Sequence, residues 1–114
     1  MLAREFILKA KEDFEKVERE GTLFQSDSFG VAVLDRGDTE SPRFGFIVSG
    51  KVSKEAVQRN RIKRALSESV RYELTTIKPG VDVVFLAKQI CTAKSTDILM
   101  REVKEVLPKV GILK

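Results

Sequence analysis

Three stretches of the chain carry apolar residues at the spacing of an α-helix. In residues 9–19 the apolar face is clearest at Phe14 and Val17, and Gly21 is expected to end the helix. A longer helix is expected over residues 54–77, with Ser53 as its N-cap. Its buried stripe steps by four, four, four and three residues through Ile62, Leu66, Val70, Leu74 and Ile77.

The last helix is expected to begin after Ser95, a second N-cap residue, and to continue to about Leu107. The apolar pattern there predicts one inward face, formed by Ile98, Leu99, Val103, Val106 and Leu107.

Other stretches favour β-strands. Residues 22–34 are rich in β-formers, with a turn or bulge expected at residues 26–28. Residues 35–42 form a polar loop, residues 43–49 predict a strand, and the nearly continuous apolar run 81–87 predicts a buried central strand. This order of elements predicts an α+β fold, a two-layer α/β sandwich with one small sheet, as a single domain over residues 1–114.

Composition narrows the possible functions. The chain has 114 residues and 42% apolar content, with no apolar run of about 20 residues and no signal-peptide pattern. It has one cysteine, Cys91, and no histidine, which removes an internal disulfide, the commonest general base and the commonest transition-metal ligand. We therefore expect a cytoplasmic protein without a membrane partner and without independent catalysis.

The positive charge is concentrated in one segment. Residues 51–71 hold seven basic and two acidic side chains, a local charge of +5, which leaves −1 for the rest of a chain whose total is +4. A concentrated patch on a nearly neutral body indicates a polyanionic partner with a defined docking surface.

The expected helix arranges these charges on one side. At about 100° per residue, a polar stripe away from the apolar one is formed by Asn60, Arg64, Ser67 and Arg71. Lys63 and Arg61 flank the stripe, and Arg59 projects nearer the apolar side. Arginine forks and lysine point charges suit an RNA backbone, although a solvated helix face is the usual explanation of a charge run.

The run Arg59-Asn60-Arg61-Ile62-Lys63-Arg64 resembles the signature of the bacterial ribonuclease P protein family. Residues 11–21 resemble the first helix of that family, and residues 44–49 resemble the strand that precedes its basic segment. The resemblance implies a small four-stranded mixed sheet with three helices, similar to a domain of ribosomal proteins and translation factors. It also implies a left-handed β-α-β crossover, against the usual hand.

The resemblance further implies a subunit of an endoribonuclease that removes the 5′ leader of precursor tRNA. Its partners would be ribonuclease P RNA and precursor tRNA, with no protein partner required. The RNA would carry the chemistry and hold most of the Mg²⁺, so no residue of this chain would be catalytic or a metal ligand.

The resemblance also assigns binding residues. Those implied to face the catalytic RNA and the start of the leader are Arg59, Asn60, Arg61, Lys63 and Arg64, with Ser49, Lys51 and Lys54 nearby. Phe14 matches an aromatic position of a leader cleft between the first helix and the sheet, although taken alone it is more often ordinary core.

Four positions depart from the pattern of the family: Glu18 and Ala32 replace frequent aromatic residues, Ser67 a frequent arginine, and Gly50 a frequent lysine. A carboxylate beside the leader path would repel phosphate.

Three other interpretations remain. A general RNA-binding or ribosome-associated module would use the same basic helix without preference for ribonuclease P RNA. A metal-dependent nuclease would need converging carboxylates, yet the acidic residues are scattered over elements expected at the surface. A DNA-binding helix module fits poorly with the strand-rich first half.

Overall fold

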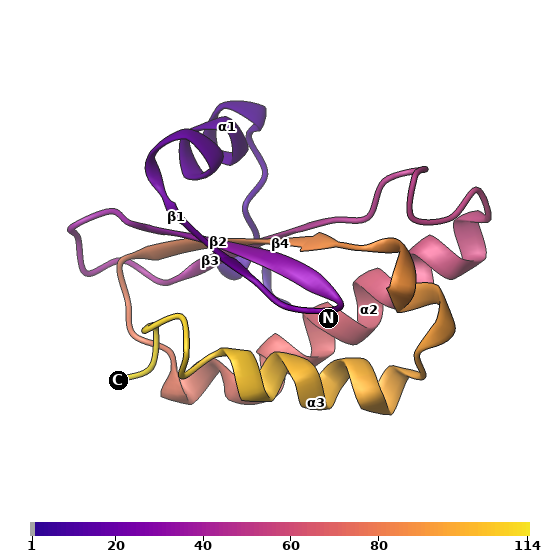
Figure 1. Ribbon diagram of the computed structural model, residues 1–114. Helices are drawn as coiled ribbons and strands as arrows, with labels where there is room; N and C mark the ends of the chain where they lie inside the picture. Colours follow the sequence, from indigo (N-terminus) through magenta and orange to yellow (C-terminus); the bar gives the residue numbers. More distant parts are fainter. Residues whose placement is uncertain (1) are drawn as a thin grey trace.

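The computed structural model describes residues 2–114, with helices on both faces of one sheet (Figure 1). The α-helices are α1 (Lys11–Glu20), α2 (Ala56–Glu73) and α3 (Thr96–Val106). The strands are β1 (Thr22–Gln25), β2 (Phe29–Asp35), β3 (Arg43–Ile47) and β4 (Val81–Ala87). Short 3₁₀ turns are η1 (Arg4–Phe6), η2 (Leu74–Thr76) and η3 (Gln89–Ala93).

The sheet has the order β1-β2-β4-β3. Neighbouring strands are antiparallel except β3 and β4, which are parallel, so α2 carries the chain from one to the other. This confirms the predicted four-stranded mixed sheet with three helices. The left-handedness of the β3-α2-β4 crossover stays a prediction. The turn expected at residues 26–28 separates β1 from β2, where the N–H of Ser26 donates to the carbonyl of Phe29 at 3.0 Å.

The two faces of the sheet are covered unequally. α2 and α3 lie side by side under one face, and α1 stands alone on the other (Figure 1). The sheet with α2 and α3 forms the predicted sandwich and holds the larger core, which includes Phe44, Leu66 and Phe85. Beneath α1 lies a smaller cluster around Val17 and Val84. The sandwich therefore gains a short helix on its outer face.

The prediction of a buried central strand over residues 81–87 is confirmed, because β4 lies between β2 and β3 in the sheet. Its first five residues, Val81 to Phe85, are buried, as a central strand with both faces covered requires. The predicted cap of the last helix is also confirmed, since Ser95 Oγ accepts from the N–H of Ile98 at 3.3 Å.

Three local predictions are wrong. α2 begins at Ala56 with Glu55 as its N-cap, and Ser53 instead accepts from the N–H of Glu55 within the preceding loop. α2 ends at Glu73, where η2 tightens the chain before Ile77 enters the core. Ile98 is 38% exposed, because it lies about 100° around α3 from Leu99, beside the buried stripe.

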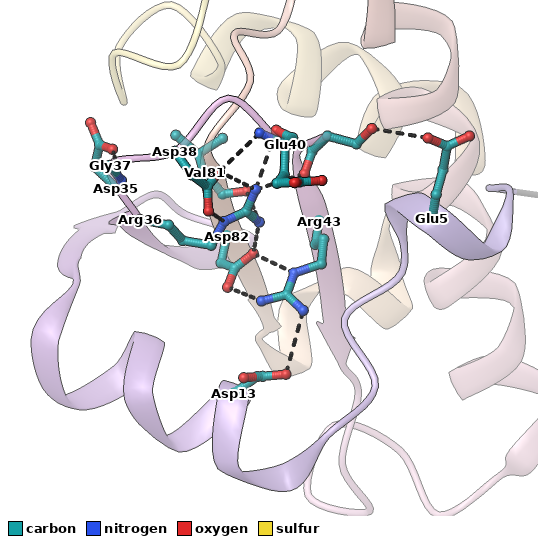
Figure 2. Close-up of polar contacts among 11 residues, drawn as sticks. Glu5, Asp13, Asp35, Arg36, Gly37, Asp38, Glu40, Arg43, Val81 and Asp82 are labelled. Atoms are coloured by element: carbon teal, nitrogen blue, oxygen red, sulfur yellow. Dashed lines mark hydrogen bonds and ion pairs between the residues drawn. The ribbon is translucent and has the colours of Figure 1, made fainter.

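A buried carboxylate clamps the loop between β2 and β3 to β4 (Figure 2). Asp82 is 3% exposed and accepts hydrogen bonds from both Arg36 and Arg43. Arg36 also binds Asp38, and Arg43 lies 3.6 Å from Asp13 on α1. The hydrogen bond to Asp82 raises the pKa of Arg43, and the one from Arg36 lowers the pKa of Asp38. The network joins α1, β3 and β4.

Within residues 2–114, no helix has the length and apolar character needed to cross a lipid bilayer.

Candidate nucleic-acid interface

The basic segment starts in the loop between β3 and α2. The N–H of Val52 donates to the carbonyl of Ser49 at 3.0 Å, and the Val52 side chain enters the core. Nη1 of Arg59 donates to the carbonyl of Ser53 at 2.9 Å. These contacts tie the loop to the first turns of α2. The exposed loop residues held beside the helix are Ser49, Lys51 and Lys54.

The outward stripe of α2 is confirmed at three of its four positions. Asn60, Arg64 and Arg71 are exposed, as their spacing predicts. The fourth prediction is wrong, because Ser67 is only 4% exposed. Ser67 and the buried Leu2 line the same small cavity, so the N-terminal segment covers this part of α2. Helical spacing alone could not reveal a cover that arrives from the other end of the chain.

Arg61 is directed into the protein. Its guanidinium donates to the carbonyls of Lys94 at 3.0 Å and Cys91 at 3.3 Å, and its Nε donates to Gln58 at 3.1 Å. The side chain therefore fastens α2 to the η3 segment. Its role in binding RNA stays a prediction, and its geometry is that of a residue that positions the helix.

Four cations remain available to a partner. Among residues 2–114, the basic-segment side chains without an intramolecular hydrogen bond or ion pair are Lys51, Lys54, Lys63 and Arg64. Because nothing in the described part of the chain neutralises them, each can hold a phosphate without first breaking a contact.

Arg71 is partly neutralised. Its guanidinium donates to Glu68 at 2.9 Å and lies 4.7 Å from the ring centroid of Tyr72. The hydrogen bond from Arg71 lowers the pKa of Glu68 from 4.5 to about 2, so this carboxylate stays charged in neutral and mildly acidic solution. An anion that binds Arg71 would have to compete with Glu68, whereas Arg64 has no such contact among the described residues.

The structure brings Phe14 and Lys63 together, although they come from α1 and α2. Both line a cavity of about 160 Å³ beneath the N-terminal segment. The Phe14 ring packs against Gly45 of β3 so closely that a Cβ at position 45 would overlap it. One cavity is thus lined by an aromatic ring and a cation, the combination that single-stranded RNA favours.

The two other positions of the expected cleft behave differently. Ala32 is buried with Val17 under α1, so it lines no open groove. Glu18 is exposed on α1, one turn after Phe14.

Metal binding or nucleophilic attack by the protein itself would depend on where the fold places its acidic residues and its single cysteine. No group of three or more Cys, Asp or Glu side chains in residues 2–114 is placed to hold a metal ion. Cys91 is fully buried, its Sγ donates to the carbonyl of Ser28 at 3.0 Å, and burial raises the pKa of its thiol. A protonated thiol without solvent access is a poor nucleophile.

Sequence reasoning missed an apolar surface on α2. Val57 and Tyr72 are 78% and 65% exposed, and they line a hollow between α2 and α3 together with Met100. The sequence could have indicated this surface, because Val57 and Tyr72 are large apolar residues that lie outside the predicted buried stripe.

Comparisons with known proteins agree on one family. The family model described as Ribonuclease P matches residues 2–111. The ribonuclease P protein component of Pseudanabaena sp. is 33% identical over 113 residues, which cover 99% of this chain and 97% of the relative. That of Bacillus velezensis is 32% identical over 107 residues, covering 94% and 90%.

Solved structures show the same likeness. The RNase P protein of Staphylococcus aureus superposes with a TM-score of 0.88 at 25% identity, covering 96% of this chain and 98% of that one. The RNase P protein of Thermotoga maritima has a TM-score of 0.80 at 23% identity, over 91% and 96%, and shows the fold alone.

Proposed function

Because this chain belongs to the ribonuclease P protein family, we propose that it is the protein subunit of a ribonuclease P holoenzyme. It binds ribonuclease P RNA and the 5′ leader of precursor tRNA, and it assists Mg²⁺-dependent cleavage at the 5′ end of the tRNA. The RNA subunit carries the chemistry.

One observation carries the RNA-binding part of this proposal. Lys51, Lys54, Lys63 and Arg64 project from one continuous segment without neutralising contacts among the described residues. Their charges match a phosphate backbone, and Asn60 beside Arg64 adds a neutral donor and acceptor for a phosphate or a 2′-hydroxyl. Arg59 and Arg61 hold the segment in place through hydrogen bonds to the carbonyls of Ser53 and Lys94. Each also adds a positive charge close to the four cations.

The leader would meet the protein near Phe14 and Lys63. The cavity that both residues line supports this proposal, because its lining combines an aromatic ring with a cation that no described residue neutralises. Glu18 opposes it by one negative charge on the same helix. We expect the leader contact to be weaker than a cleft with an aromatic residue at position 18 would give.

The interface does not fit a Mg²⁺ site formed by the protein. Magnesium prefers carboxylate and water oxygens. The side chains that share the stripe with Asn60 include the cations Arg64 and Arg71 and no carboxylate. The nearest carboxylate along α2, Glu68, is already bound to Arg71. The protein would instead neutralise phosphate repulsion in the folded RNA, which lowers the Mg²⁺ concentration that the RNA requires.

The test is reconstitution with a bacterial ribonuclease P RNA at a Mg²⁺ concentration too low for that RNA to act alone. We expect the protein to stimulate cleavage of precursor tRNA at its 5′ end, and we expect protein alone to cleave nothing. Absence of stimulation, or full activity without RNA, would refute the proposal.

A matched pair of variants checks the surface. Lys63→Ala/Arg64→Ala should reduce stimulation, whereas Lys109→Ala/Lys114→Ala removes the same charge outside the basic segment and should not. Equal binding of unrelated structured RNAs by the wild-type chain would instead indicate a general RNA-binding module.

A further inference from the structure

α2 and α3 are separated on their solvent side by a groove. The main hollow has a volume of about 610 Å³, within the range of small-molecule sites. Val57 and Tyr72 of α2 and Met100 of α3 supply its apolar lining. A smaller hollow of about 220 Å³ continues it, and Tyr72 and Met100 line both. Tyr72 therefore stands at the junction of one extended groove.

This apolar surface is unusual for its position. Val57 and Tyr72 are among the most exposed large apolar side chains, although both lie on a helix whose other side is fully used by the core. Packing within the chain therefore does not explain why Val57 and Tyr72 are apolar. Singly exposed apolar residues are ordinary on a protein surface, so the inference rests on the groove that both side chains line.

The rim of the groove carries a net positive charge and joins the proposed RNA surface. Asn60 and Arg64, which belong to the outward stripe, also line the main hollow. Arg101, Lys104 and the acidic Glu73 line the smaller one, and Arg101 lies 4.0 Å from Glu105. The carboxylate of Glu68 lies in the main hollow but is bound to Arg71, so its charge is largely offset. A ligand with an apolar face and a negative charge matches this arrangement.

We propose that the groove receives an unstacked base of a single-stranded segment of RNA. The base lies against the ring of Tyr72, and the adjoining phosphate is held by Arg64. The inference rests on the proposed function in one respect, since that function makes the partner an RNA. It adds a site for a base that is distinct from the cavity at Phe14 and that shares Arg64 with the outward stripe.

The surroundings of Tyr72 favour a nucleotide over an apolar peptide. The guanidinium of Arg71 lies over the ring, 4.7 Å from its centroid, and Tyr72 is still 65% exposed, so a base can stack on its accessible surface. Every base has a flat face that can stack on an aromatic ring, and the phosphate of the same nucleotide lies close to it. A peptide helix would use the apolar lining but would leave Arg64 without a matching charge.

The chain supplies its own reporter for this site. It contains one tyrosine and no tryptophan, so the near-ultraviolet emission of the protein comes almost entirely from Tyr72. The full chain would be titrated with ribonuclease P RNA and, separately, with a short oligouridine. We expect RNA to quench the emission, with saturation at the RNA concentration where a filter-binding assay also saturates. Unchanged Tyr72 emission in the fully bound complex would overturn the proposal.

Two substitutions separate stacking from charge. Tyr72→Ala should weaken RNA binding roughly 5- to 150-fold, the range found for loss of one stacked base, and should leave the salt dependence unchanged because no phosphate contact is lost. Tyr72→Phe keeps the aromatic face and should bind like the wild type. Ile90→Ala is the matched control, since it removes another exposed apolar side chain outside the groove. Equal affinity of Tyr72→Ala and wild type would overturn the proposal.

The outcomes also distinguish this proposal from the proposed function. If Tyr72→Ala binds RNA and stimulates cleavage as the wild type does, the base site fails and the subunit role stands. If the wild-type chain does not bind ribonuclease P RNA, both the subunit role and the base site fail. If Tyr72 emission changes with protein concentration alone, together with the mass in solution, the groove is an interface between two copies and the proposal is overturned.

Discussion

Arg43 and Asp82 are register partners across β3 and β4, and their side chains form a two-pronged ion pair. Nε of Arg43 donates to Oδ1 of Asp82 at 2.9 Å, and Nη2 donates to Oδ2 at 2.8 Å. Arg36 binds the same carboxylate from the loop after β2 (Figure 2). One buried acid therefore neutralises two arginines at the end of the sheet where the β2–β3 loop returns.

The first prediction concerns the stability of this clamp. Asp82→Asn should lower the free energy of unfolding by about 3 kcal/mol, because it leaves two arginines without their shared counter-charge in a buried place. Urea denaturation monitored by circular dichroism measures the change. Asp38→Asn is the control, since Asp38 is an exposed partner of Arg36 and its loss should change stability little. Equal effects of both variants would show that burial of Asp82 contributes nothing.

Arg61 gives a prediction that separates positioning from binding. Arg61→Ala should destabilise the protein by about 1–3 kcal/mol, because the carbonyls of Lys94 and Cys91 lose their donor. Below its unfolding temperature the variant should keep most of the salt slope of RNA binding. A variant of full stability with a reduced slope would instead place Arg61 at a phosphate.

How far the sequence predicted this molecule depended on the range of the contacts involved. The bounds of β4 and the cap at Ser95 follow from local pattern, and both are confirmed. Ser53 misled because a serine hydroxyl can accept within a loop as readily as at a helix start, and the burial of Val52 delays the helix. Side-chain identity fixes what a residue can do locally, while the neighbouring segments decide which of those contacts form.

The candidate site shows the same division. The exposure of Asn60 and Arg64 followed from helical spacing, whereas the burial of Ser67 depends on the N-terminal segment. The inward turn of Arg61 depends on carbonyls 30 and 33 positions further along the chain. The groove at Tyr72 exists only because α3 lies beside α2, which periodicity within either helix cannot show.

Arg64 carries the prediction on electrostatics. Arg64→Ala should weaken binding of ribonuclease P RNA and reduce the slope of log affinity against log salt by about 1, because one phosphate contact is lost. Filter binding over a range of salt concentrations measures both. Lys109→Ala removes one positive charge after α3 and should leave the slope unchanged. The same slope for Arg64→Ala and the wild type would show that this helix face is only solvated.

Cys91 gives a prediction on pH. Burial raises the pKa of its thiol, so the folded state disfavours the thiolate that the unfolded chain forms with a pKa of about 8.5. The resulting contribution to stability is complete below that pH and is lost as pH rises above it. Native protein should therefore resist iodoacetamide at pH 7.5, and it should react on addition of urea. Cys91→Ser should flatten the fall of the unfolding temperature above pH 8.5. Rapid alkylation of the native chain would contradict the burial.

Glu18 tests the direction in which the leader contact can be improved. Glu18→Gln removes a negative charge one turn from Phe14, so precursor tRNA with a leader should bind the holoenzyme roughly two- to fivefold more tightly. Glu12→Gln makes the same change about 200° around α1 from Phe14 and is the control. The measurement is the ratio of affinities for precursor tRNA and for mature tRNA, since the mature tRNA lacks the leader and should respond to neither substitution. An equal gain from both variants would mean that net charge, rather than a leader path beside Phe14, determines the affinity.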